Sequence, residues 1–179
     1  PGVVVLSVAE QKQTQFFPIP HIWNGLAFDR EGKRLFVSGG NSGEVHVFKY
    51  DAGKLEALPS VKVAQDGVPK FVSGIAVHPE NGKLYVCNEA NHEIWLLNAE
   101  TFALEQSLPV GLHPHSCVFG ADKRHLYVSN WGSRSVSVVD STNGRELREL
   151  GVGVRPNDMA LAPDGRLFVA CSGDNTVHV

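Results

Sequence analysis

Two histidines that flank a proline have the types and spacing that most directly suggest chemistry in this sequence. His113 and His115 could both reach one metal ion, and His21 or His92 could complete a site from elsewhere in the chain. Two histidines supply only half of a tetrahedral ligand set, however. We therefore expect a ligand-contacting or structural pair and no tightly bound metal.

Hydroxyl and acidic side chains offer two possible catalytic sets. Ser116 follows His115, but neighbours on a strand point to opposite faces, so a Ser-His hydrogen bond is not expected even with Asp158 further along. Glu89 with Asp158 or Asp174 could form a carboxylate pair, yet the sequence carries no sign of a raised pKa. We therefore assign no catalytic residue, no metal ligand and no cofactor.

A recurring apolar signature shows which elements must position these residues. Its copies are Leu35-Phe36-Val37, Leu84-Tyr85-Val86, Leu126-Tyr127-Val128 and Leu167-Phe168-Val169. A second signature follows each copy, as in Val45-His46-Val47-Phe48 and Val136-Ser137-Val138-Val139. The copies recur at about 40 to 50 residues, which is typical of a β-propeller blade.

Each repeat predicts four short strands and almost no helix. In the clearest copy the strands are 115–119, 126–130, 136–140 and 146–151, with turn-forming residues between them. The fold expected is an all-β propeller segment of about four blades, built from four-stranded antiparallel sheets. The approximate divisions are 1–20 as a half blade, 21–63, 64–110, 111–152 and a partial 153–179, with an added loop over 64–72.

Both ends of the chain read as third strands of a blade. An open arc would leave apolar sheet faces exposed at its two ends. We therefore expect the remaining blades of a larger propeller, or a second copy of the chain, to cover these faces.

Four residues share one register on the innermost strands and should be buried between blades: Leu26, Ile75, Cys117 and Met159. His78 is expected at a surface turn. Asn88, Asn130 and Asp140 end strands and should bond the backbone of their own turns.

Two sets of loops meet on one face of such a fold, where propellers and other rigid scaffolds usually carry function. The loops that precede the innermost strands and those between second and third strands are rich in polar and aromatic residues. We expect ligand contacts from His21, Asn24, Ser73, Glu89, His113, His115, Trp131, Arg155, Asn157 and Asp158. Trp131 is either an exposed binding contact or a ring packed in the core.

The composition argues against several classes of partner and site. The 179 residues carry a formal net charge of -3 and 42% hydrophobic residues, so nucleic acid is not an expected partner of this globular chain. Apolar runs are too short for a membrane segment. Cys87, Cys117 and Cys171 are odd in number and widely spaced, which favours buried thiols over a disulfide framework or a zinc site.

The stretches Leu126-Tyr127-Val128-Ser129-Asn130 and Arg155-Pro156-Asn157-Asp158, with the repeats around them, resemble the YVTN-type β-propeller repeat. The resemblance covers nearly the whole chain. It implies bacterial or archaeal surface or periplasmic propellers, seven-bladed lactonase-like enzymes, or the haem-carrying propeller of nitrite reductases as relatives. It also implies a periplasmic or extracellular location.

The function expected from the residues and the resemblance is a scaffold that presents its loop face and central channel to a small ligand or a protein partner. One alternative is a lactonase-like hydrolase with a metal or carboxylate site in the channel. The other is a propeller that carries haem or another cofactor, which requires an axial histidine such as His113 or His115 in an open channel.

Overall fold

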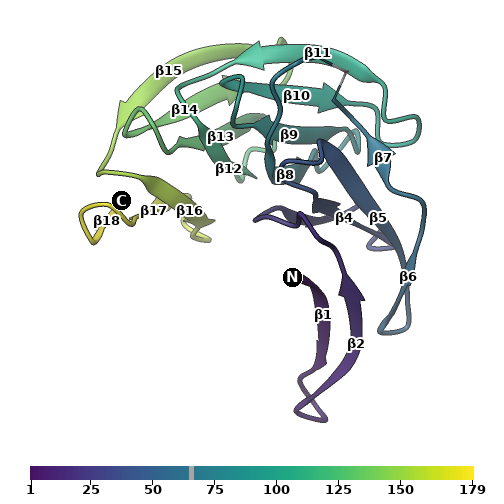
Figure 1. The fold of residues 1–179 in the computed structure, drawn as a ribbon. Helices are drawn as coiled ribbons and strands as arrows, with labels where there is room; N and C mark the ends of the chain where they lie inside the picture. Colours follow the sequence, from purple (N-terminus) through teal and green to yellow (C-terminus); the bar gives the residue numbers. More distant parts are fainter. Residues whose placement is uncertain (65–66) are drawn as a thin grey trace.

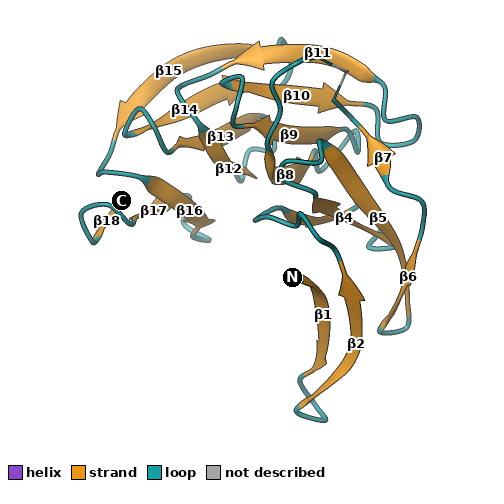
Figure 2. Cartoon of the chain, in the orientation of Figure 1, coloured by secondary structure: helices purple, strands orange, loops and turns teal. Residues whose placement is uncertain are grey.

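The regular structure of the chain is strand throughout the residues that the computed structural model describes, 1–64 and 67–179 (Figure 2). This confirms the expected all-β fold. None of the described residues forms a helix that could cross a lipid bilayer.

Antiparallel sheets follow one another around an open arc (Figure 1). A hairpin begins it, with β1 (Gly2–Ser7) and β2 (Lys12–Pro18). Blade I contains β3 (Leu26–Phe28), β4 (Arg34–Ser38), β5 (Glu44–Asp51), β6 (Lys54–Ala57) and β7 (Val61–Lys62). Blade II contains β8 (Val72–Val77), β9 (Leu84–Asn88), β10 (Glu93–Leu97) and β11 (Leu104–Pro109).

The arc continues through two further sheets. Blade III contains β12 (Pro114–Phe119), β13 (His125–Asn130), β14 (Ser135–Asp140) and β15 (Arg145–Gly151). Blade IV has β16 (Pro156–Leu161), β17 (Leu167–Cys171) and β18 (Thr176–His178). The strands of blade III match their expected ranges to within one residue at each end.

The lengthened stretch 64–72 includes residues 65 and 66, which lie outside the described residues. Its flanks are tied to blade I. The backbone nitrogens of Val63 and Ala64 donate to the Gly43 carbonyl oxygen, and Gly40 and Val72 exchange backbone hydrogen bonds of 3.1 and 3.0 Å. The chain is therefore anchored on both sides before β8 begins.

The hydrophobic core is divided among the interfaces between sheets. In β9, Leu84 and Val86 pack toward blade I, whereas Tyr85 and Cys87 pack toward blade III. Alternate side chains on a strand point to opposite faces, and both faces of a blade have a neighbour. This explains why the strands read as continuous apolar runs. The three cysteines are buried and unbonded, as expected.

The register prediction for the innermost strands is confirmed at three positions and wrong at one. Ile75, Cys117 and Met159 are buried, but Leu26 is 60% exposed. Leu26 faces the hairpin side of blade I, where β1 and β2 supply only an outer pair of strands. An apolar groove of about 300 Å³ between the hairpin and blade I remains beside Leu26.

His78 lies at a turn, as expected, but it is buried and not on the surface. Its side chain packs against Phe119, with ring centroids 4.9 Å apart, and Nε2 lies 3.2 Å from the Ser141 hydroxyl of blade III. Burial lowers the pKa of His78. The turn is covered because the next blade packs over it.

The strand-ending polar side chains follow the expectation at Asp140 and differ from it at Asn88 and Asn130. Asp140 does bond its own turn, accepting from the Thr142 backbone nitrogen. Asn88 instead reaches back to the loop before β8, accepting from Phe71 N–H and donating to the Pro69 carbonyl. Asn130 donates to the hydroxyls of Ser135 and Ser137. These two asparagines therefore fasten the loop face and are not local turn formers.

Substituting Ile75 by Ala should lower the free energy of unfolding by roughly 2 to 5 kcal/mol, because it removes buried apolar contacts and leaves a cavity between blades. Leu26→Ala is the matched control at the same register. Since Leu26 is exposed, its truncation should cost less than about 0.5 kcal/mol. Urea denaturation measures both values, and equal effects would show that the blade interfaces are wrongly placed.

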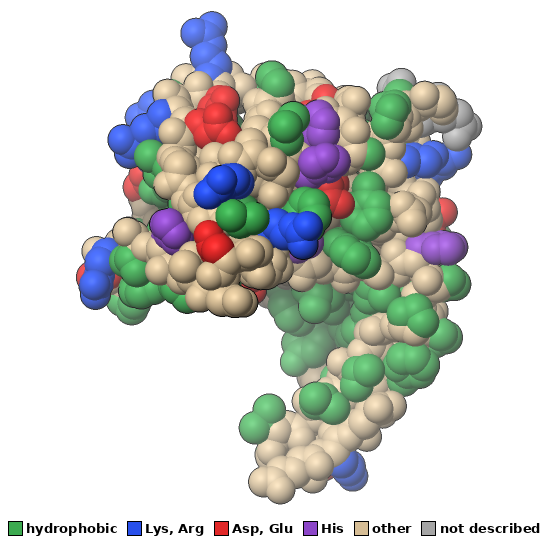
Figure 3. Space-filling model, turned by 60° about the vertical axis from the view of Figure 1, so that its left-hand side comes forward, with side chains coloured by type: hydrophobic (Ala, Val, Ile, Leu, Met, Phe, Trp, Pro, Cys, Tyr) green, Lys and Arg blue, Asp and Glu red, His purple; other side chains and the backbone are tan. Residues whose placement is uncertain are grey.

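The isolated chain should associate in solution. Val4, Leu6 and Leu26 are exposed at one end of the arc, and Val177 and Val179 at the other. Hydrophobic side chains cover much of the hairpin, which projects from the body (Figure 3). Soluble monomers rarely leave more than roughly 600 Å² of contiguous apolar surface uncovered. Light scattering should show a dimer or larger species, and a stable 19.4 kDa monomer at rising concentration would contradict this expectation.

Candidate ligand-binding site

The innermost strands of blades II, III and IV are irregular at the positions of the candidate residues. The register with the second strand shifts between Val72 and Ile75, between Pro114 and Ser116, and between Pro156 and Met159. A β-bulge bends the strand and re-aims the side chains beside it. Each shift falls on candidates expected from the sequence, namely Ser73, His115, and Asn157 with Asp158.

Gly74 sets the separation between two innermost strands. A Cβ atom on Gly74 would lie 2.8 Å from the His115 carbonyl oxygen and 2.7 Å from the Ser116 Cα. Both neighbours are backbone atoms of β12, which could not yield without moving the strand. Glycine at this position therefore allows the His115 segment of blade III to approach β8 closely.

Residues from three blades converge on His115. The Asn24 side-chain amide lies 3.0 Å from His115 Nε2, and Glu89 Oε1 lies 3.4 Å from His115 Nδ1. Because the amide nitrogen can only donate, Nε2 accepts and the ring proton lies on Nδ1, facing the carboxylate. We call Asn24, Glu89 and His115 the channel cluster. Its side chains come from the loop before β3, the loop after β9 and the start of β12.

Neighbouring polar residues hold the channel cluster in place. The Ser73 hydroxyl is buried and donates to the Pro114 carbonyl at 3.0 Å. Ser116 lies 3.4 Å from Asp158 Oδ1, so its hydroxyl is directed to an acid of the next blade. The Asn157 side-chain oxygen accepts from Ser172 at 3.2 Å. Ser73, Asn157 and Asp158 thus join adjacent strands and blades.

A second group of side chains crosses the same face further out. Arg155 places its guanidinium carbon 4.8 Å from the Trp131 ring centroid, a cation–π arrangement. The His113 ring lies edge-on to Trp131 at 6.4 Å and to His92 at 4.8 Å. We call His92, His113, Trp131 and Arg155 the outer cluster. Figure 3 shows histidine, basic and hydrophobic side chains close together on the body of the molecule.

Trp131 is half-buried between these neighbours. Its burial is intermediate between the two alternatives that the sequence left open, an exposed binding contact and a ring packed in the core. His92 is not among the ligand contacts expected from the sequence, although it lies in one of the loops expected on this face. Its contact with His113 depends on how blades II and III pack together. The distance between the two rings cannot be read from the spacing of residues in the sequence.

His21 stands apart from both clusters. Its side chain is exposed, and within the described residues it makes no hydrogen bond, ion pair or ring contact with the other candidates. Nearby Trp23 packs edge-on against Phe71 at 5.2 Å. The His21–His113–His115 combination considered for a metal is therefore not assembled here.

Across residues 1–64 and 67–179, no three His, Cys, Asp or Glu side chains are grouped closely enough to hold a metal ion. The channel cluster offers one imidazole, one carboxylate and one amide. Both ring nitrogens of His115 already have partners, which also makes it a poor axial ligand for a haem. The channel cluster fits neither a metal ion nor an axial haem ligand.

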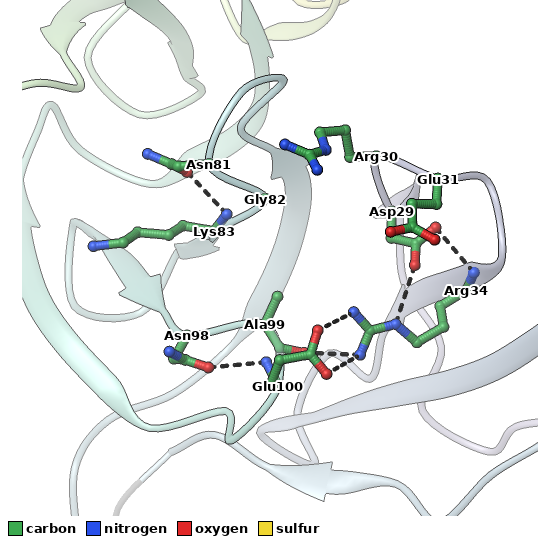
Figure 4. A pocket seen from close by; sticks show the side chains of 10 residues that line it. All are labelled: Asp29, Arg30, Glu31, Arg34, Asn81, Gly82, Lys83, Asn98, Ala99 and Glu100. Atoms are coloured by element: carbon green, nitrogen blue, oxygen red, sulfur yellow. Dashed lines mark hydrogen bonds and ion pairs between the residues drawn. The ribbon is translucent and has the colours of Figure 1, made fainter.

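The opposite face carries a pocket of about 260 Å³ between blades I and II (Figure 4). Arg34 lines one side of it, with ion pairs to Asp29 at 3.1 Å and Glu100 at 2.6 Å. Burial raises the pKa of Asp29, but hydrogen bonds from the Arg34 backbone and side chain outweigh it, so the net pKa is lowered. These ion pairs join two blades, so we interpret the pocket as structural.

Comparison with known proteins agrees with the architecture. The family model described as SMP-30/Gluconolactonase/LRE-like region matches residues 3–132. The model described as WD domain, G-beta repeat matches residues 150–179. The uncharacterized protein YncE of Salmonella typhimurium is 20% identical over 155 residues, which is 85% of this chain and 42% of that protein.

Solved structures give the same fold. A putative 6-phosphogluconolactonase from Bacteroides uniformis aligns with a TM-score of 0.77 at 17% identity, covering 98% of this chain and 59% of its own. Hydrazine synthase of Kuenenia stuttgartiensis aligns at 0.72 and 20% identity, covering 87% of this chain and 43% of its own. At such identities the likeness shows the fold alone.

The chain spans between 42% and 59% of the length of these relatives. The resemblance to the YVTN-type repeat stays a prediction within the propeller class. Because the first family model covers well over half of the sequence, the chain belongs to the SMP-30/gluconolactonase/LRE-like family of β-propeller proteins.

Proposed function

We propose that this chain is a propeller binding scaffold whose channel mouth holds a small, neutral, polar ligand such as a sugar or a sugar lactone. The observation that carries the proposal is the convergence of Asn24, Glu89 and His115 from three blades. An amide, a carboxylate and an oriented imidazole supply the donors and acceptors that hydroxyl groups need. A protein partner that presents similar groups would use the same face.

A lactonase-like hydrolase is the second candidate, favoured by the family and by the Glu89–His115 pair. A carboxylate at Nδ1 would orient the imidazole so that Nε2 could take a proton from water. In this structure, however, Nε2 already accepts from the Asn24 amide. A ligand would have to displace Asn24 before His115 could act as a base, which is why binding is our first proposal.

Calorimetric titration with D-glucose and D-glucono-1,5-lactone tests the binding proposal. His115→Asn should weaken the affinity about tenfold, the equivalent of one or two lost hydrogen bonds. His125→Asn is the control, because His125 begins β13 at the end of the blade away from the channel cluster, where it pairs with Asp122. Unchanged affinity in His115→Asn, or no binding to either compound, would refute the proposed site.

Acid release from D-glucono-1,5-lactone, followed by pH-stat above the spontaneous rate, separates binding from hydrolysis. A scaffold should give no additional rate. A protein-dependent rate that disappears in both Glu89→Gln and His115→Asn would establish the hydrolase instead.

Protein purified without added metal should contain zinc, copper and iron far below one equivalent per chain. The channel cluster provides too few ligands for a tetrahedral or octahedral site. Elemental analysis by mass spectrometry measures this directly. A stoichiometric metal that is lost in His115→Asn would overturn the expectation.

A further inference from the structure

We infer that the outer cluster is a subsite for an anionic group, a phosphate or a carboxylate, bound by Arg155, His92 and His113 beside the Trp131 ring. The inference rests on the proposed use of the loop face for binding. It adds that the ligand carries an anionic group. The neutral part of the ligand would lie at the channel cluster and the anionic group at the outer cluster.

Arg155 is held by a ring and not by an acid. Its guanidinium lies over Trp131 at 4.8 Å and its side chain is exposed. On the opposite face Arg34, Arg124 and Arg166 each form an ion pair with an acid, at 2.6 to 3.1 Å. Within the described residues no ion pair includes Arg155. Stacking orients the planar group but leaves its N–H donors at the rim, in the geometry that binds a carboxylate or phosphate.

His92 supplies a second donor with a defined direction. Its Nδ1 lies 3.1 Å from the backbone nitrogen of His113 and accepts that hydrogen. An imidazole whose Nδ1 accepts carries its proton on Nε2 when neutral. Within the described part of the chain Nε2 has no hydrogen-bond partner. The half-buried ring therefore presents an N–H group to the surface beside His113.

His113 completes the row because its exposed ring lies between His92 and Trp131. Gly132 provides the necessary space, since a Cβ there would lie 2.6 Å from His113 Cδ2. Blade II thus contributes His92, blade III contributes His113 and Trp131, and blade IV contributes Arg155. Basic side chains from three blades therefore lie along this row, on the two sides of Trp131.

The nearby carboxylates are already engaged. Glu89 faces His115, and Asp158 accepts from Ser116. Asp174 accepts from the Val154 backbone nitrogen at 2.7 Å and from Thr176 at 2.7 Å. These hydrogen bonds, the backbone one first, lower the pKa of Asp174. Within the described residues none of these acids pairs with the outer cluster, so its basic side chains are left for an external anion.

The backbone permits a clean test. His92, His113 and Arg155 all have left-handed backbone conformations, with φ of 58°, 53° and 55°. Asparagine adopts this conformation more readily than other residues with a side chain, apart from aspartate and histidine. Replacing Arg155 by Asn therefore removes the guanidinium without opposing the turn. Arg134 is the matched control, since it is an exposed arginine on the same face with φ of 57° and, within the described residues, no ring contact.

Inorganic phosphate and malonate are titrated separately by calorimetry at fixed ionic strength, because surface charge effects are screened by salt. Arg155→Asn should weaken binding about tenfold or more, whereas Arg134→Asn should change it less than about twofold. Tighter binding of phosphate would indicate a phosphate ester as the natural group, and tighter binding of malonate a carboxylate. Thermal unfolding of both variants should match the wild type.

Three results would overturn the inference: no binding of either anion to the wild type, equal losses in the two arginine variants, or an unchanged affinity in Arg155→Asn. The channel proposal is measured independently, because D-glucose is neutral and its binding depends on His115. Binding of glucose with no binding of anions would reject the outer subsite alone. Binding of anions without glucose would reject the channel proposal alone.

Discussion

Every blade of this protein has to bury both of its faces, and the rest of the structure depends on that constraint. A strand such as β9 sends alternate side chains to the blades before and after it, so no blade has a core of its own. Stability therefore comes from the contacts between blades. The same constraint explains the apolar residues left exposed at the two ends of the arc, where one face of a sheet has no full neighbour.

Packing between blades also creates the candidate site. The innermost strands approach closely enough at Gly74 that backbone meets backbone, and they bulge where Ser73, His115 and Asn157 lie. No single blade contains the channel cluster or the outer cluster. Their distances follow from how neighbouring blades are set against each other, so a ligand bound across them would also report on the integrity of the blade interfaces.

Much of this could be predicted from the sequence because the information is local and repeated. Four copies of one apolar signature determine the strand positions, and the loops of one face follow from strand order. Leu26 and His78 were misplaced for the same reason: burial depends on whether a neighbouring sheet covers the position. The repeat register places Leu26 at an interface between sheets, but the hairpin covers that interface only in part. The residue types of the turn at His78 do not reveal that Ser141 of blade III lies over it.

The sequence by itself determined the all-β blades, their order and the set of polar and aromatic residues on one face. Only the tertiary structure decided which of them meet: His115 with Asn24 and Glu89, and Arg155 with Trp131. The physical reason is the difference in range. Strand periodicity and turn preference act over a few residues, whereas these contacts join residues that lie between 24 and 91 positions apart and depend on the angle between blades.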